Sequence, residues 1–301
     1  MTYDAGVRLR GTPLSFDAVR RRELCVLTGL RERAPAAHRR TVVPSDMAAA
    51  LERLGLRERL LPLPTGRWGG IGAQRLQFLA VGDGWERAAA LVLIGEERVI
   101  VAGRLLAGET SVTEADHLVV EVAAPGHRGA EVAQVAVAVG EFVEQTQRDG
   151  WGADVWVEGL GVGVLLWRAL IGAGVRASAV GPLATVLGLD SANARPGVRL
   201  AVMGSRLPAR RRIAWVDSGL GVWDRYASRR RAVDATFRLR YLASSAELDA
   251  AVASTGAREV TVIGAPPAAT GDVGERWPGV GTRWLTTPVQ QALGAVSRVA
   301  N

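Results

Sequence analysis

The sequence predicts a mixed α/β protein built as one large domain or as two interleaved ones, and three observations support this. The chain has 301 residues, of which 48% are hydrophobic, so it is long enough to bury a sizeable core. Its first third contains short apolar segments that are typical of strands. From about residue 130 onward, helix and strand patterns alternate, which favours a parallel sheet covered by helices.

The first third is expected to form a sheet mainly from strands that are near neighbours in the sequence. A helix capped by Ser45 or Asp46 is predicted to run to about residue 60, because Leu51, Leu54 and Leu56 give it an apolar side. The predicted strands cover residues 11–17, 23–28, 75–81, 88–94, 98–102 and 117–122.

The remainder is expected to alternate between the two element types. Helices are predicted over residues 130–149, 161–172 and 245–254 and from about residue 288, and strands over 153–158, 175–180, 198–203, 213–216, 232–239, 259–263 and 282–285. In the first of these helices, Val132, Val135, Val139 and Phe142 are expected in the core. The apolar stretch 159–175 contains Arg168 and several glycines, which indicates a buried helix rather than a membrane span.

Cysteine usage and charge suggest the compartment and the partner. The single cysteine, Cys25, excludes an internal disulfide framework and fits a reducing cytoplasm, and residues 1–10 lack the apolar core of a signal peptide. No membrane partner is expected. The net charge of +7 and the pI near 10.8 suggest an acidic partner, with nucleic acid the first candidate. All 37 basic residues are arginine, however, which is also typical of codon bias in a GC-rich genome.

Motifs for hydrolytic chemistry are scarce. The three histidines form no HxH or HExxH pattern and there is no CxxC pair, so no zinc spacing is present. His117, Glu121 and His127 are the one conceivable ligand set, and isolated surface histidines are the favoured interpretation. The glycine-rich turn at residues 159–163 lies between a predicted strand and a predicted helix. It suits either close packing, which is favoured, or phosphate binding.

The order of the motifs nevertheless resembles that of a known enzyme family. The opening GVRLRGTPLSFDAVRRRELC at residues 6–25 and HRRT at residues 38–41 are similar to the flanks of the metal motif S-H-A-H-x-D-H. That motif belongs to the bacterial metallo-β-lactamase exonucleases of the RNA-processing and DNA-ligase-associated kinds. Glu121 matches the family's acidic residue, and Ser218-Gly219 resembles its S-G-W. The matches are collinear over nearly the whole chain. The resemblance implies an α/β fold: a metallo-β-lactamase αββα sandwich formed by residues 1–135 and 232–301, with an inserted β-CASP α/β domain at residues 136–231.

The same resemblance shows where the family holds two zinc ions, and this chain lacks most of the donors. The vestigial positions are Asp17, Gly29, Arg31, Arg33, Ala34, Asp83, Arg104, Glu121, Leu242 and Ile263. Only Asp17 is clearly retained, Asp83 stands where the family has a histidine, and Glu121 matches a motif for proton handling or orientation. Glycine, alanine, leucine and isoleucine side chains donate no lone pair, and arginine repels a cation. Because two metals are needed to activate a bridging water, no catalytic residue, metal or other cofactor is expected.

The expected function is therefore that of a catalytically inactive nuclease-like protein. It would bind nucleic acid or act as a scaffold in DNA repair or RNA processing, with a nuclease, ligase or helicase as its protein partner. One alternative is an active, metal-dependent DNA or RNA exonuclease with a rearranged site built on Asp17, Asp83 and Glu121. Another is a protein-interaction module without affinity for nucleic acid.

Arginines supply the candidate nucleic-acid-binding residues. Arg31, Arg33, Arg104 and Arg240 fall where metals or their ligands would converge, and they can hold a phosphodiester without cutting it. The alternative, which we favour, is that these arginines pair with Asp17, Asp83, Glu32 and Glu121. Outside this cleft the candidates are Arg210, Arg211, Arg212, Arg229 and Arg230, with Trp215, Trp223 and Tyr226 available to stack on bases. The competing interpretation is a solvated basic face with tryptophans in the core.

Overall fold

The protein contains three β-sheets in the part of the chain that the computed structural model describes. The described residues are 2–3, 6–30, 36–81, 88–102, 114–122, 127–189, 197–202, 211–218, 233–243, 245–263 and 277–285. Several of the positions singled out from the sequence lie outside these ranges: Arg31, Arg33, Ala34, Asp83, Arg104, Arg210, Arg229, Arg230, Trp223, Tyr226 and the helix expected from residue 288.

The first sheet is built from the N-terminal segment in sequence order. Its strands are β1 (Thr2–Tyr3), β2 (Val7–Arg8), β3 (Ser15–Phe16), β4 (Leu24–Val26), β5 (Arg40–Pro44) and β6 (Leu60–Leu63). Strands β3 to β6 are parallel to one another, so they begin at one edge of the sheet and end at the other. Helix α1 (Ser45–Arg53) connects β5 to β6 and is followed by the short helix η1 (Arg57–Arg59).

The second sheet combines neighbours in sequence with strands from the C-terminal part. Its order is β18 (Gly281–Leu285), β17 (Glu259–Ile263), β11 (His117–Glu121), β10 (Glu97–Ala102), β9 (Ala88–Ile94), β8 (Gln74–Ala80) and β7 (Trp68–Ile71). Strands β7 to β10 form antiparallel pairs, as hairpins allow. Strands β10, β11, β17 and β18 are parallel, so their C-terminal ends share one edge.

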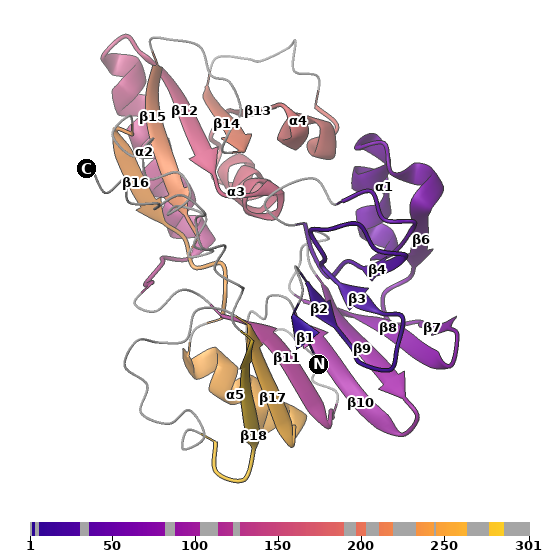
Figure 1. Ribbon diagram of the computed structural model, residues 1–301. Coiled ribbons are helices and arrows are strands. Elements are labelled where there is room, and N and C mark those ends of the chain that lie inside the picture. Colours follow the sequence, from indigo (N-terminus) through magenta and orange to yellow (C-terminus); the bar gives the residue numbers. More distant parts are fainter. Residues whose placement is uncertain are drawn as a thin grey trace, which may run out of the picture.

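These two sheets pack face to face between helices, which gives four layers (Figure 1). Phe16 and Val26 of the first sheet share a core with Phe78 and Val101 of the second. On the outer face of the first sheet, Met47 and Leu51 of α1 are fully buried. On the outer face of the second sheet, helix α5 (Ser245–Thr255) buries Leu248 and Val252 against Leu118 and Val260.

The third sheet is formed by the part of the chain that lies between β11 and β17 in the sequence, and all its strands are parallel. Its order is β13 (Ala177–Val180), β14 (Val198–Val202), β12 (Gly152–Val157), β15 (Arg211–Asp217) and β16 (Ala235–Arg238). Helices α2 (Val132–Arg148) and α3 (Leu160–Gly172) cover one face, and the short helix α4 (Pro182–Leu187) follows β13. Strand β16 pairs with β15 and so belongs to this sheet. The sequence-based boundary at residue 232, which assigned β16 to the sandwich formed with residues 1–135, is therefore wrong for this strand.

The helices of the third sheet share one core with the first sheet. That core runs from Leu30 and Leu51 through α2 and α3 to Leu170. A Cβ added at Gly161, in the first turn of α3, would overlap the hydroxyl of Tyr241 and the carbonyl of Leu30. The glycine at 161 therefore allows α3 to approach the backbone of the first sheet's segment. We call this junction the seam.

Several elements differ from the sequence-based expectation. Helix α1 ends at Arg53 instead of near residue 60, because Gly55 takes a left-handed conformation with φ of 81°. The strand expected over residues 11–17 is reduced to β3, since Thr12 lies in a turn where its hydroxyl donates to the Leu9 carbonyl. The short strands β1, β2, β5, β6 and β7 and the helix α4 have no counterpart in the expectation.

Candidate functional site

The strand ends at the seam are where the structure gathers the described vestigial positions. Asp17 directly follows β3 and has a left-handed backbone, with φ of 48°. Its carboxylate is buried and accepts hydrogen bonds from the Thr28 amide at 2.8 Å and the Thr28 hydroxyl at 2.5 Å. Thr28 and Gly29 follow β4, which lies beside β3. The side chain of Asp17 thus ties two strand ends together.

A second group of vestigial positions meets at the ends of β11 and β17. Glu121 is the register partner of Ile263, and the following residue, Val122, bridges to Ala243 beside Leu242. Leu242, Ala243 and Ile263 are all buried. Glu121, Leu242 and Ile263 are therefore neighbours although they are far apart in the sequence. Leu242 and Ile263 have aliphatic side chains.

This donor set does not fit the two metal ions that the family resemblance implies. Aliphatic side chains at Leu242 and Ile263 and the missing side chain at Gly29 offer no lone pair to a cation. Within the described residues, no three histidine, cysteine, aspartate or glutamate side chains are grouped so that they could hold a metal ion. Arg31, Arg33, Ala34, Asp83 and Arg104 belong to the same set but lie outside the described residues.

The third sheet contributes buried polar groups to the seam. Glu158 follows β12 and Ser218 follows β15, and the Glu158 carboxylate accepts hydrogen bonds from the Ser218 amide at 2.8 Å and from the Ser218 hydroxyl. Beside them, His127 contacts the carbonyl of Leu239 at 3.0 Å and lies 3.8 Å from the carboxylate of Asp217. Sequence reasoning singled out Ser218 but missed Glu158, whose place just before the glycine-rich turn was the available signal.

The glycine-rich turn serves packing. Gly159 precedes α3, and Gly161 and Gly163 are buried in its first turn. A Cβ at Gly163 would meet the side chains of Leu183 and Val157, and Gly161 is equally tight against Tyr241. Both glycines are explained by the close approach of neighbouring chain, which agrees with the favoured interpretation of this turn.

The described candidate arginines are all ion-paired. Arg240 pairs with Glu131 and, at 3.4 Å, with Glu247. Arg211 donates to Asp154 at 2.7 Å. Arg212 pairs with Asp149 at 2.8 Å. The partners differ from those expected for the cleft arginines, since Arg240 contacts helix residues instead of Glu121. Trp215 is fully buried, so it belongs to the core and does not offer a stacking surface.

The expectation of isolated surface histidines is wrong, because each histidine side chain is buried in a bonded position. The amide of Arg22 donates to His38 Nδ1 at 3.1 Å, and burial together with the nearby Arg22 charge lowers the pKa of His38. His117 Nε2 lies 2.8 Å from the Thr261 hydroxyl, and burial lowers its pKa despite the opposing effect of Glu259. His38 and His117 thus serve as hydrogen-bonding groups in the core.

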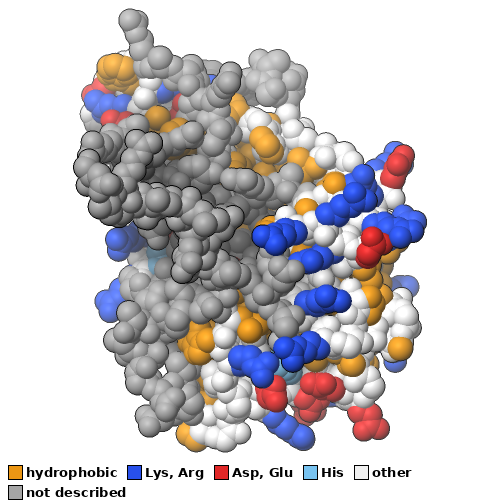
Figure 2. Space-filling view, viewed as in Figure 1, with side chains coloured by type: hydrophobic (Ala, Val, Ile, Leu, Met, Phe, Trp, Pro, Cys, Tyr) orange, Lys and Arg blue, Asp and Glu red, His pale blue; other side chains and the backbone are white. Residues whose placement is uncertain are grey.

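A row of exposed arginines lies at the other edge of the first sheet, where its parallel strands begin. We call this row the basic edge; its members are Arg8, Arg10, Arg20, Arg21, Arg39, Arg40, Arg57 and Arg59. They gather there because Arg20 and Arg21 precede β4, Arg39 precedes β5 and Arg40 begins it, and Arg57 and Arg59 precede β6. Figure 2 shows basic side chains over the part of the molecule where Figure 1 places α1 and β2 to β6.

Most of the basic edge is not neutralised by described acidic residues. Arg39 pairs with Glu23 at 2.9 Å, and Arg40 donates to the backbone carbonyl of Glu58 at 3.2 Å. Arg8, Arg10, Arg21, Arg57 and Arg59 form no ion pair with another described residue. Sequence reasoning did not single out this row, because only the parallel pairing of β4, β5 and β6 aligns its members.

No helix in the described part of the chain is long and apolar enough to cross a membrane.

Comparisons with known proteins identify a fold relative without a known function. No protein-family model matches the sequence, and no curated protein matches it either. Among solved structures, the crystal structure of a protein of unknown function from Enterococcus faecalis V583 superposes with a TM-score of 0.54. The two sequences are 10% identical, and the alignment covers 86% of this chain and 78% of that chain. At this identity the likeness shows a shared fold alone.

Proposed function

We propose that this chain binds nucleic acid without hydrolysing it, through the basic edge of its first sheet. The observation that carries the proposal is the row of exposed arginines at the starts of β4, β5 and β6. Strands in a sheet are about 4.8 Å apart, so a row across the five strands β2 to β6 is about 19 Å long. Phosphates along one strand of a DNA duplex rise by about 3.4 Å each and those of an extended single strand are spaced more widely, so this row can meet several of them in either form.

The architecture supports a relationship to the metallo-β-lactamase/β-CASP nucleases as part of the same proposal. A four-layer sandwich completed by C-terminal strands, with a parallel sheet formed by the chain between, is the arrangement that this resemblance implies. The lack of hydrolysis follows from the aliphatic side chains of Leu242 and Ile263 at the strand ends. Asp17 is explained by its bonds to Thr28 and needs no metal. The chain is then a pseudonuclease, and a protein partner would supply any cleavage.

The binding test uses a fluorescent 20-nucleotide single strand, as DNA and as RNA, titrated at several salt concentrations. For five phosphate contacts, the logarithm of the association constant should fall with the logarithm of salt at a slope of about −3.5. The double substitution Arg21→Glu and Arg59→Glu should reduce the affinity and flatten the slope by about 1.4. Arg67→Glu with Arg258→Glu is the matched control, because these arginines are also exposed and form no described ion pair.

Three results would contradict the proposal in different ways. No binding at low salt would favour a protein-interaction module. An equal loss in the control pair would show that net charge, rather than the basic edge, drives binding. Degradation of either strand in the presence of zinc or manganese, abolished by Asp17→Asn, would establish the active exonuclease with a rearranged site.

A further inference from the structure

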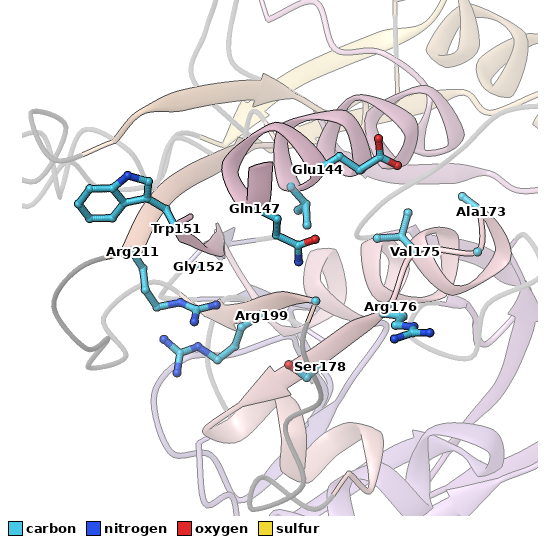
Figure 3. A pocket seen from close by; sticks show the side chains of 14 residues that line it. Glu144, Gln147, Trp151, Gly152, Ala173, Val175, Arg176, Ser178, Arg199 and Arg211 are labelled. Atoms are coloured by element: carbon cyan, nitrogen blue, oxygen red, sulfur yellow. The ribbon is translucent and has the colours of Figure 1, made fainter. Parts of the chain in front are cut away.

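A pocket of about 690 Å³ opens at the edge of the third sheet where its strands begin, at the opposite end of β12 from Glu158 (Figure 3). Its polar lining comes from Glu144 and Gln147 of α2, from Trp151, Arg176 and Ser178, and from Arg199 and Arg211 of β14 and β15. Figure 3 shows Arg199 and Arg211 side by side, with Trp151 on one side and Arg176 on the other. Ligand pockets in proteins typically have volumes of about 300–1,000 Å³, so this one can hold a small molecule.

Two of these arginines are fixed in place by one buried carboxylate. Asp154 of β12 is fully buried and accepts bonds from Arg199 Nε at 2.9 Å, Arg199 Nη2 at 2.7 Å and Arg211 Nε at 2.7 Å. Arg211 Nη2 also donates to the carbonyl of Ala153 at 2.8 Å. Two guanidinium groups carry ten N–H donors and these bonds use four, so six remain for a ligand. Both side chains keep some exposure, 19% and 25%.

Glycines make room for this arrangement. A Cβ at Gly152 would overlap the guanidinium of Arg211, which lies across the start of β12. Gly197, just before β14, has a φ of +159°, and a Cβ there would overlap the carbonyl of Arg176. The backbone at the pocket thus lets the arginines converge in a way that side chains at these two positions would prevent.

The charges in the pocket favour an anion. Arg176 forms no ion pair with a described residue, so Arg176, Arg199 and Arg211 against Asp154 leave an excess of two positive charges. Glu144 is paired with Arg148 at 3.2 Å and adds nothing to the balance. Helices α2 and α3 both end at this edge, and their C-terminal dipoles oppose an anion by about half a charge each. About one positive charge remains, which attracts a phosphate monoester of charge about −1.5 to −2.

We propose that this pocket binds a nucleoside monophosphate, with the phosphate on Arg176, Arg199 and Arg211 and the base against Trp151. Trp151 is 45% exposed at the pocket, and an exposed indole beside cations offers an aromatic base a face to stack on. Arginine forks match the oxygen geometry of phosphate. This site is separate from the basic edge and does not depend on nucleic-acid binding there.

The test is calorimetric titration of the full chain with adenosine 5′-monophosphate, with adenosine and inorganic phosphate as partial probes. The complete nucleotide should bind more tightly than either part. Arg176→Gln should weaken it about tenfold, because a charge-assisted contact is lost without exposing Asp154. Trp151→Leu should weaken it at least about fivefold through lost stacking. Arg67→Gln, a change of the same kind at an exposed arginine outside the pocket, should leave the affinity unchanged.

Each contrary result overturns the proposal. Failure to bind the nucleotide at millimolar concentration would show that Arg199 and Arg211 serve only to neutralise the buried Asp154. Equal affinity for inorganic phosphate and for the nucleotide would show that the base makes no favourable contact with the protein. Unchanged affinity in both Arg176→Gln and Trp151→Leu would place the ligand elsewhere. Circular dichroism of the variants separates these outcomes from unfolding.

Discussion

Replacing Gly161 by alanine should open the seam between the third sheet and the first. An added Cβ would lie less than 3.0 Å from both the Tyr241 hydroxyl and the Leu30 carbonyl, a separation that real Cβ atoms essentially never show. One of these atoms is backbone and the other belongs to a fully buried side chain, so neither can move away cheaply. Overpacking of this kind costs about 1–3 kcal/mol. We therefore expect the free energy of unfolding to fall by about 2 kcal/mol, within that range.

The same helix provides a matched control. Gly172 is the last residue of α3, is exposed, and has open space where a Cβ would be. Gly172→Ala should therefore stabilise the protein by about 0.4–1 kcal/mol, because alanine restricts the unfolded chain and favours the helix. The same substitution of glycine by alanine should thus lower the free energy of unfolding at residue 161 and raise it at residue 172.

Urea denaturation followed by circular dichroism measures both effects, and thermal melting supports it. A change of 1 kcal/mol shifts the melting temperature of a chain of roughly this size by about 2–4 °C. If Gly161→Ala stabilised the protein as much as Gly172→Ala, the reasoning about the seam would be refuted, because α3 would not be held against Leu30 and Tyr241. A loss of stability in both variants would show that the cost is not specific to the seam, because open space at Gly172 leaves an added Cβ nothing to overlap.

Two further predictions concern buried polar groups. Burial lowers the pKa values of His38 and His117 in the folded protein. As the pH falls through about 6.5, these histidines therefore become protonated in the unfolded chain before they do so in the folded one. The free energy of unfolding should decrease as the pH falls from about 6.5 towards the lowered pKa values of the folded state. Urea titrations between pH 8 and pH 5 check this, and His38→Asn should flatten the profile; a flat profile in the parent chain would contradict it. Asp17→Ala should cost about 1–3 kcal/mol, because the buried amide of Thr28 loses its acceptor. Asp17→Asn should cost less, since asparagine keeps an acceptor and tolerates the left-handed backbone, and equal losses in urea melts would show that the Asp17 side chain holds nothing in place.

Local sequence patterns were sufficient for the longer elements. The apolar spacing of Val135 and Val139 predicted α2, and the alternation after residue 130 predicted a parallel sheet, because helix and strand periods are properties of adjacent residues. The resemblance to the family also selected Glu121, Leu242 and Ile263, which the register of β11 and β17 and the bridge beside it bring together. Short strands such as β5 and β6 carry too few residues for a period to be seen, so they were missed.

Charge and polarity at the candidate sites depended on tertiary structure. All the basic residues are visible in the sequence, yet which of them are neutralised depends on partners far away, as with Arg211 on Asp154 and Arg240 on Glu131. The sequence by itself determined the types of the longer elements, the absence of histidine ligand motifs and the excess of arginine. Only the folded chain decided that Arg21 and Arg59 lie on one exposed edge while Arg199 shares a buried carboxylate with Arg211. The physical reason is that electrostatic interactions act through space, and strand pairing sets the distances between residues that the sequence keeps far apart.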